Sequence, residues 1–344
     1  MYKKKVEKKM KENPRFIPFI VKIIIGLIAF VGMFVAAMVL GAADISVKDV
    51  WLALATNATS DKILIIREIR LPREVAAILV GAALAVSGAI MQGMTKNPLA
   101  DPGLLGLTAG ANAALAITIA FLPGANYFGI MIACFIGAAA GAILVFGVSS
   151  IKKGGFGPFR IVLAGAAISA LLYAIADGIG IYFKLSKQVS MWTAGGLIGA
   201  SWNQLGIITP FILIGILIAI FLSRQLTILS LSEGIAVGLG QKTAQIKFIL
   251  FIVIILLAGA SVALVGNIAF IGLIIPHVVR AFVGRDYRFI IPMSVILGAI
   301  LMLFADTLGR TINAPYETPV AAIVAMMGLP FFLLIVRKGG KLCS

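Results

Sequence analysis

Long runs of apolar residues, each about as long as a lipid bilayer is thick, dominate this sequence of 344 residues. A hydrocarbon core of about 30 Å is crossed by about 20 helical residues, because a segment inside lipid must satisfy its own backbone hydrogen bonds. We interpret ten such runs as transmembrane helices: 16–42, 73–94, 102–122, 126–150, 159–183, 206–223, 246–265, 269–283, 288–308 and 318–336. The expected fold is therefore an all-α polytopic membrane protein of about ten helices.

The composition excludes a soluble protein. Of all residues, 61% are hydrophobic and 12% are charged, whereas soluble domains are typically about 45–50% apolar and about 25% charged. The net charge of +16 is compatible with a nucleic-acid partner, but the basic residues stand in short tufts between the apolar runs, so we expect no nucleic acid. Two cysteines and one histidine give neither a disulfide framework nor a metal site.

The number of spans depends on the stretch 248–283, which carries no charge before Arg280. It reads either as one long tilted helix or as two short helices broken near Gly266-Asn267. Ten spans place 21 of the 29 Lys and Arg residues on the cytoplasmic side, as the positive-inside rule requires, whereas nine spans move Arg280–Arg288 outside. With both termini in the cytoplasm, the expected organisation is a basic tail at 1–15, one transmembrane domain at 16–338 and a short tail at 339–344.

Groups for chemistry inside the membrane are scarce. The sequence has no carboxylate pair, no nucleophile–base set and no phosphate-binding loop, so we expect no catalysis by this chain alone. A secondary transporter driven by an ion gradient remains an alternative of another class, but such transporters usually keep ionisable groups near the bilayer midplane. Asp306 and Arg310 stand four residues apart, which allows a helical ion pair.

Seven short motifs lie in order along the chain: Ile69–Arg73 (IRLPR), Leu79–Gln92 (LVGAALAVSGAIMQ), Asn97–Gly106 (NPLADPGLLG), Gly266–Arg280 (GNIAFIGLIIPHVVR), Ala305–Arg310 (ADTLGR), PYETP at 315–319 and GLP at 328–330. Together they resemble the FecCD-type permeases, the membrane subunits of ATP-binding-cassette (ABC) importers for iron siderophores and cobalamin. The resemblance extends from about residue 16 to residue 338.

This resemblance implies a type II ABC importer permease fold in a bacterial cytoplasmic membrane. It also implies that the chain pairs with a second permease chain, identical or related, and binds two ATP-binding subunits on the cytoplasmic side. An extracytoplasmic binding protein would deliver the substrate. The chain itself would hold no cofactor, because ATP and Mg would be bound by the partner subunits.

Two stretches favour a ferric siderophore as the substrate. Met191–Gly196 and Gly199–Trp202 look more like the iron-chelate branch of the family than the cobalamin branch. The expected function is thus uptake of an iron chelate driven by ATP hydrolysed in partner subunits. Cobalamin or heme is the alternative substrate.

At the outer side, the resemblance implies that Arg70, Arg73 and Arg310 receive acidic residues of the binding protein. Arginine suits this task because its planar fork holds a carboxylate with two hydrogen bonds. The open alternative is contact with lipid headgroups, or an internal pair such as Arg310 with Asp306.

At the inner side, the resemblance assigns the region 228–242 to coupling with the ATP-binding subunits, through Glu233, Gly238, Leu239 and Gly240. The alternative for this region is an ordinary surface turn. Asn97 and Leu99 match positions of a cytoplasmic gate, and the alternative there is a proline-fixed turn that caps the preceding helix. A further family gate has small hydroxyl residues where this chain has Gly157-Pro158-Phe159, which leaves that role unassigned.

Overall fold

The computed structural model describes residues 16–41, 45–56, 58–150, 158–187, 189, 196–314 and 316–339, and in these ranges it contains helices and connecting segments but no strand. The helices are α2 (Phe16–Val39), α3 (Val47–Ala55), α4 (Asp61–Ile65), the π-helical turn η1 (Ile66–Arg70), α5 (Leu71–Thr95), the 3-10 turn η2 (Pro102–Leu105), α6 (Leu107–Phe121), α7 (Tyr127–Ser150), α8 (Pro158–Tyr182), α10 (Trp202–Phe221), α11 (Ser223–Leu231), α12 (Glu233–Gly238), α13 (Thr243–Val265), α14 (Ile271–Val283), α15 (Tyr287–Thr311) and α16 (Val320–Gly339).

The expected fold class is confirmed. Within the described residues, seven helices are long and apolar enough to cross a membrane, judged by length and composition. Three shorter apolar helices, at Leu107–Phe121, Ile271–Val283 and Val320–Ile335, fall on three further spans expected from the sequence. Each of the ten expected spans therefore coincides with an apolar helix in the described part of the chain.

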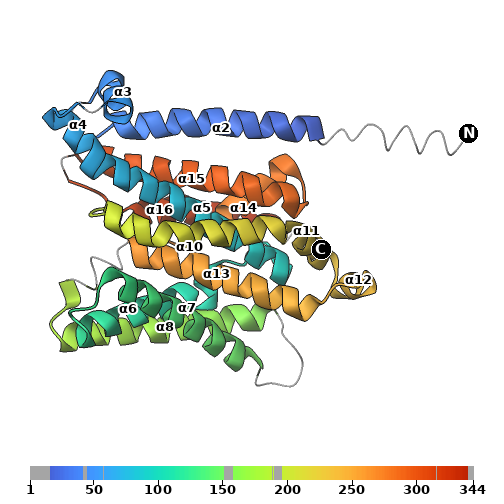
Figure 1. The fold of residues 1–344 in the computed structure, drawn as a ribbon. Helices are drawn as coiled ribbons and strands as arrows, with labels where there is room; N and C mark the ends of the chain where they lie inside the picture. The colour runs from blue at the N-terminus through green and yellow to red at the C-terminus, as the bar shows by residue number, and fades with distance from the viewer. Residues whose placement is uncertain are drawn as a thin grey trace, which may run out of the picture.

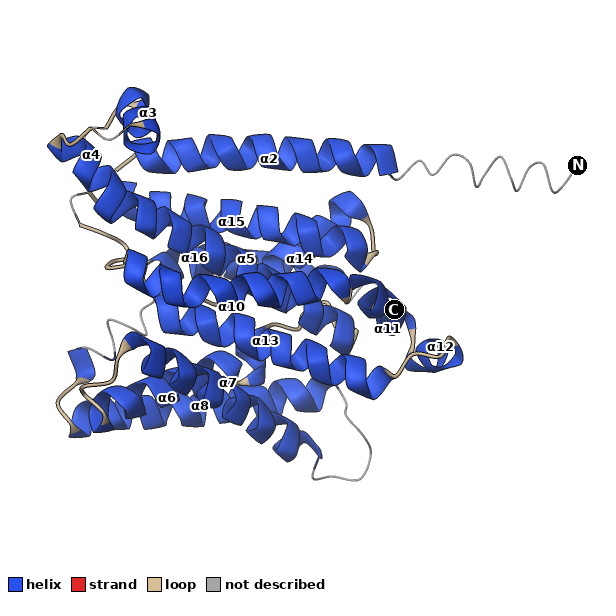
Figure 2. Ribbon diagram, in the orientation of Figure 1, coloured by secondary structure: helices blue, strands red, loops and turns tan. Residues whose placement is uncertain are grey.

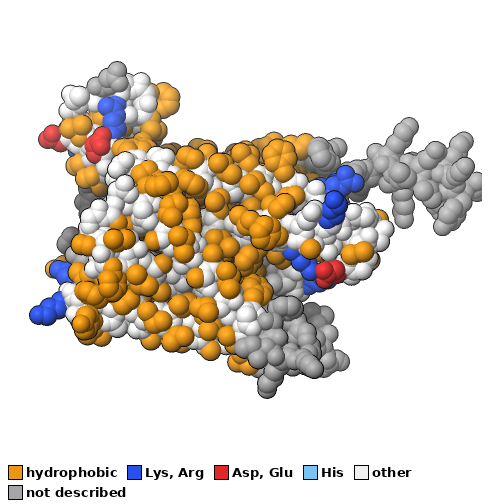
Figure 3. All heavy atoms as spheres, turned by 60° about the horizontal axis from the view of Figure 1, so that its bottom comes forward, with side chains coloured by type: hydrophobic (Ala, Val, Ile, Leu, Met, Phe, Trp, Pro, Cys, Tyr) orange, Lys and Arg blue, Asp and Glu red, His pale blue; other side chains and the backbone are white. Residues whose placement is uncertain are grey.

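The long helices lie side by side in one bundle, with α2 at one edge and α6, α7 and α8 at the opposite edge (Figures 1 and 2). Helices α3 and α4 lie at one end, which we call the outer end, following the orientation expected from charge. Helix α12 projects at the other end, the inner end, where α2 begins. Figure 3 shows charged side chains gathered at the two ends and an uncharged, largely apolar flank between them, as a membrane-spanning bundle requires.

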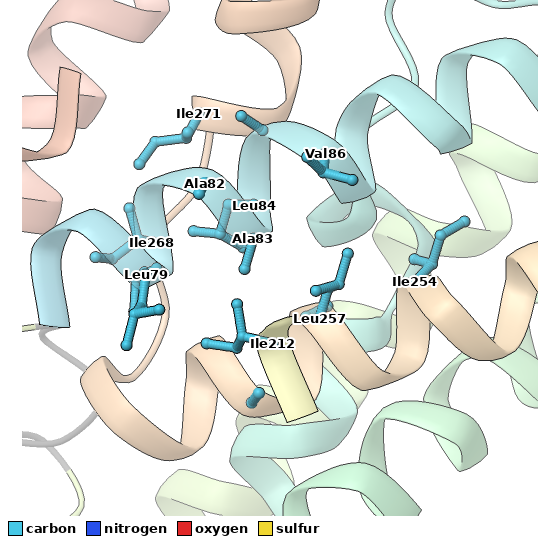
Figure 4. Packing of buried hydrophobic residues seen from close by; sticks show 14 of the residues in the cluster. Leu79, Ala82, Ala83, Leu84, Val86, Ile212, Ile254, Leu257, Ile268 and Ile271 are labelled. Carbon is cyan, nitrogen blue, oxygen red and sulfur yellow. The ribbon is translucent and has the colours of Figure 1, made fainter. Parts of the chain in front are cut away.

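Helix α5 forms the centre of the bundle. It packs against α10, α13, α14 and α15, and Figure 4 shows Leu79, Ala83 and Val86 of α5 among apolar side chains of α10, α13 and α14. Its glycines allow close approach: a Cβ atom at Gly81 would collide with the carbonyl oxygen of Gly298 in α15, and one at Gly88 with Gly272 in α14. Small residues at such crossings are the usual way in which helices pack in lipid.

The start of the second span differs from the expectation. The sequence predicts that this helix begins near residue 73, whereas the structure continues it from Asp61 to Thr95. The π-helical turn η1 makes this possible, because the N–H of Leu71 donates to the carbonyl of Ile66, five residues back. Pro72 then occupies the first turn of α5, where its missing N–H is tolerated.

Two other spans contain breaks. The structure confirms the break near Gly266: α13 ends at Val265, Gly266 has φ +75°, and α14 begins after Phe270 with φ +71°. The span expected at 102–122 is divided into η2 and α6 by Gly106, whose φ is +74°. Both breaks bring non-helical backbone into the protein interior, where neighbouring helices rather than lipid surround it.

Candidate functional site

Three basic and three acidic side chains meet at the outer end of the bundle, and we call them the outer charge cluster. They come from η1, α5, α15 and the segment before α16. The members are Arg70, Arg73, Glu74, Asp306, Arg310 and Glu317. Five of them are at least 92% buried, and only Glu317 is exposed. The positive and negative charges of the cluster balance.

Arg73 is held by two carboxylates. Its Nε and Nη2 donate to Oδ1 of Asp306 at 3.0 and 2.8 Å, and its Nη1 donates to Oε1 of Glu317 at 2.8 Å. This forked geometry is the strong form of an arginine–carboxylate pair. The side chain of Glu317 keeps 34% of its surface exposed, so its contact is at the rim of the cluster, whereas Asp306 is completely buried.

Arg310 and Arg70 bind the end of α2. Arg310 pairs with Oδ2 of Asp306 at 3.0 Å and with Glu74, and its Nη2 donates to the carbonyl of Ala37 at 3.1 Å. Arg70 donates to the carbonyls of Met38 and Val39. The last carbonyls of a helix have no partner within the helix, and cations there also favour the helix dipole. The cluster thus joins α2, α5 and α15.

The structure brings the three arginines of the sequence prediction together, but it places them inside the protein. The internal pair of Arg310 with Asp306, which the sequence left open, is present. Glu74 and Glu317 are further partners that the sequence does not indicate. Glu74 stands four residues after Arg70 on a helix, yet its partner is Arg310, 236 residues away, and no local spacing reveals such a contact.

At the inner end, α12 is a short capped helix on the surface. Ser232 caps it by accepting from the N–H of Ile235 at 3.0 Å. Glu233 pairs with Nζ of Lys247 at 2.7 Å, and this hydrogen bond lowers the pKa of Glu233 below its usual range. Gly240 ends the turn with φ +77°.

The surface around α12 is apolar. Four side chains there are more than half exposed: Leu231, Ile235, Val237 and Leu239. A Cβ atom added at Gly238 would meet no other atom within 4 Å. The region considered from the sequence as a surface turn is therefore a helix, and the described residues leave its apolar side chains uncovered. Its coupling role stays a prediction.

The turn after α5 is locally stabilised. Lys96 ends α5 with φ +53°, and Oδ1 of Asn97 accepts from the N–H of Leu99 at 3.0 Å. Asn97 and Leu99 are half-buried, so the structure shows the capping turn, while the gate role stays a prediction. In the other gate segment, Gly157 lies outside the described residues and Pro158 and Phe159 begin α8.

Asp101 is a buried acid that the sequence analysis missed. Its Oδ1 accepts from the N–H of Gly103 at 2.8 Å and caps η2, and its side chain is 7% exposed. A Cβ atom added at Gly272 would lie 2.9 Å from Oδ2 of Asp101. The signal was present in the sequence, because Asp followed by Pro is typical of a helix start. Asp101 precedes the span expected at 102–122, so the apolar runs themselves stay poor in ionisable groups.

The chain is similar to known transport proteins over nearly its whole length. The profile of the FecCD transport family matches residues 27–338. The iron(3+)-hydroxamate import system permease protein FhuB of Bacillus subtilis (strain 168) is 45% identical over 300 residues, which cover 87% of this chain and 78% of FhuB. The Fe(3+)-citrate import system permease protein YfmD of the same organism is 39% identical over 334 residues, with 97% and 98% covered.

A solved structure has the same fold. It is an inward-facing conformation of a metal-chelate type ABC transporter, with a TM-score of 0.78 and 28% identity, and the match covers 92% of this chain and 99% of that one. Fold, motifs and full-length relatives therefore agree. This chain belongs to the FecCD transport family and is a multi-pass permease subunit of an ABC importer.

Proposed function

We propose that this chain moves a ferric siderophore inward across a bacterial cytoplasmic membrane, with energy from ATP that two partner subunits hydrolyse. The observation that carries this proposal is the similarity, over most of both chains, to permeases named for iron(3+)-hydroxamate and Fe(3+)-citrate import. A hemin permease of Yersinia pestis is also similar, at 38% identity, so heme is the competing substrate.

The chemistry of the substrate suits this chain. A chelated ferric ion is already coordinated by its chelator, so the pathway needs room and weak contacts rather than metal ligands. Weak binding also helps transport, because a ligand bound equally well in both access states does not shift the equilibrium between them. The energy that separates the two states would come from ATP in the partner subunits.

The second permease chain would sit against α8. This helix exposes large apolar side chains along its length, including Leu163, Leu171 and Ile181. The pathway would then run between α8 and the matching helix of the second chain. Whether the two chains are identical or related follows from the genes that accompany this one.

The binding protein would dock on the outer charge cluster, where one of its carboxylates would replace a carboxylate of this chain as the partner of an arginine. Arg73 offers one such position, because its Nη1 is held by the rim residue Glu317 while its other N–H groups stay on the buried Asp306. An acidic side chain of the binding protein would replace Glu317 and leave the buried fork intact. Arg70 and Arg310 would hold the surrounding helices in place.

Coupling would use α12, whose exposed apolar residues fit a groove on the ATP-binding subunit, with Glu233, Gly238, Leu239 and Gly240 at the contact. A helix with one apolar face is a common ligand for such a groove. The turn at Asn97 and Leu99 would close the inner end of the pathway between transport events.

The test is uptake of radioactive iron in cells that lack this gene and in cells that regain it. We expect the gene to restore uptake of a ferric hydroxamate or ferric citrate, and a proton ionophore to leave that uptake intact while ATP is maintained. If the gene restored uptake of cobalamin or hemin alone, the assignment of a ferric siderophore as the substrate would be wrong. Uptake that follows the ion gradient and ignores ATP would overturn the mechanism.

A further inference from the structure

Helix α3 carries a stripe of exposed apolar side chains that its own packing does not use. Val47, Trp51 and Leu54 are 61, 68 and 52% exposed, and their spacing of four and three residues puts them on one side of the helix. The residues that hold α3 in place are others. Val50 and Ala53 are buried in a small separate core with Met38, Ile45, Ile63 and Ile66.

The helix that carries this stripe is firmly fixed. Ser46 and Asp49 form a capping box at its start, which satisfies free N–H groups at that end. At its other end, Arg67 donates from Nε to the carbonyl of Ala53 at 2.8 Å, and also to the carbonyls of Thr56 and Ala58. The exposed stripe is thus a defined surface on a rigid element.

The position of α3 indicates what covers the stripe. In Figure 1, α3 lies at the outer end and projects past α2, beyond the edge of the bundle. The outward side of α2 is itself apolar and exposed, at residues such as Ile25, Ile28 and Val31, and α2 lies at the edge of the bundle, which is where a transmembrane helix meets lipid. The stripe on α3 therefore adjoins a lipid-facing surface and stands away from the centre of the bundle.

We propose that α3 lies on the outer surface of the bilayer and anchors the outer end of the bundle to lipid, with Trp51 at the centre of the contact. Tryptophan is enriched at the membrane–water interface because its ring is apolar and its N–H is polar. Lys48 is exposed beside the stripe, where its long stem can cover apolar surface while its ammonium group meets phosphates. Short helices with this pattern lie in the plane of the interface.

This anchor would set the height of the outer charge cluster. Arg67 and the small core tie α3 to η1, and η1 continues directly into α5, which carries Arg73. A lipid contact at Trp51 would therefore fix how far the cluster stands above the membrane surface. The inference does not depend on which substrate the permease carries.

The experiment measures how deeply Trp51 lies in lipid. The chain has three tryptophans, so Trp192→Phe with Trp202→Phe leaves Trp51 as the single emitter. The purified variant is reconstituted into phosphatidylethanolamine–phosphatidylglycerol vesicles that contain lipids brominated at acyl positions 6 and 7 or at positions 11 and 12. We expect the shallow bromines to quench the emission at least twofold more than the deep ones, and acrylamide in the water to quench it weakly.

Two single-tryptophan variants in a background without native tryptophan provide matched controls. Leu54→Trp lies on the same stripe and should also be quenched more by the shallow bromines than by the deep ones. Lys62→Trp lies on α4, where Lys62 is exposed, and should respond to acrylamide alone. Emission from Trp51 and from Leu54→Trp that ignores brominated lipid and follows acrylamide would overturn the proposal, and protection from acrylamide only after addition of the binding protein would assign the stripe to that protein.

Discussion

Asp306 is the residue on which the outer charge cluster depends. It accepts hydrogen bonds from Arg73, forms an ion pair with Arg310 and is completely buried. A buried charge that loses its partner is expensive, at about 3–5 kcal/mol. This single carboxylate is shared by two buried guanidinium groups, and each of them has one further carboxylate partner, Glu317 for Arg73 and Glu74 for Arg310.

We predict that Asp306→Asn lowers the stability of the detergent-solubilised protein by several kcal/mol, because Asn cannot neutralise Arg73 and Arg310. The measurement is the temperature at which half of the protein is lost from the monodisperse peak in gel filtration. Glu68→Gln is the control, because Glu68 is an exposed acid at the same end and should leave this temperature unchanged. Equal stability of both variants would contradict the role of Asp306.

Glu317 gives a second prediction at this scale. Its pair with Arg73 is partly exposed, and such pairs contribute about 0–1 kcal/mol, so Glu317→Gln should barely change stability. If Glu317 competes with the carboxylate of the binding protein, the same variant should bind that protein several-fold more tightly. Surface plasmon resonance on permease in nanodiscs measures the affinity.

The outcomes of that measurement separate two ideas. If Glu317→Gln left the affinity unchanged while Arg73→Lys weakened binding, the binding protein would dock at Arg73 without replacing Glu317. Unchanged affinity for both would reject docking at this cluster. Charge reversal at Arg73 is a poor test, because a glutamate there would face the buried Asp306 and damage the fold.

At the scale of helices, glycines at the points where helices cross let α5 approach its neighbours closely. We predict that Gly88→Val prevents normal packing of α5 against α14, because the new side chain would overlap the backbone of Gly272. Overpacking costs typically about 1–3 kcal/mol, and a collision with backbone leaves less room for adjustment. The amount of folded protein after extraction measures the effect.

Gly32→Val is the matched control for this prediction. Gly32 lies in α2, and a Cβ atom there would meet no atom within 4 Å. The same added volume should therefore be tolerated. If both variants extract equally well, the close crossing of α5 and α14 is not needed for folding.

The apolar runs of the sequence predict where the helices lie, but they do not predict where the second span begins. The apolar runs predicted ten segments because lipid imposes one length and one composition. The charged stretch 61–72 falls outside the expected spans because it is not apolar, although it is helical. Two of its arginines bind groups in other segments, since Arg67 binds carbonyls at and just after the end of α3 and Arg70 binds the end of α2. A local sequence pattern contains no information on such contacts.

The candidate site was predictable to a similar degree. The family motifs pointed to the three arginines and to the region of α12, because motifs record residue types in order. They did not show that Arg73 meets Asp306 across 233 residues, nor that the cluster is neutral. Burial and pairing arise from the packing of helices, which the sequence alone does not display.

At the scale of the whole molecule, transport requires that events at the two ends be linked. We predict that Gly238→Trp leaves the permease folded, because its side-chain position is open, but lowers substrate-stimulated ATP hydrolysis by the assembled importer at least tenfold. The bulky ring would hold α12 out of its groove. The measurement is phosphate release from proteoliposomes with and without loaded binding protein.

Gly124→Trp is the control for the coupling prediction. Gly124 is equally open and lies in the connection between α6 and α7, at the outer end. Its tryptophan should leave stimulated hydrolysis intact. Normal stimulation in Gly238→Trp would remove α12 from the coupling surface.

The balanced outer charge cluster has a consequence for how fast the binding protein arrives. On the orientation adopted here, the outer side carries eight basic and eight acidic residues, so the whole net charge of +16 belongs to the inner side. Without a net field, encounter at the outer face is not accelerated by long-range attraction, and association proceeds near the unsteered rate of about 10⁵–10⁶ M⁻¹s⁻¹. Discrimination between binding proteins would then reside in how long each one stays, rather than in how often it collides.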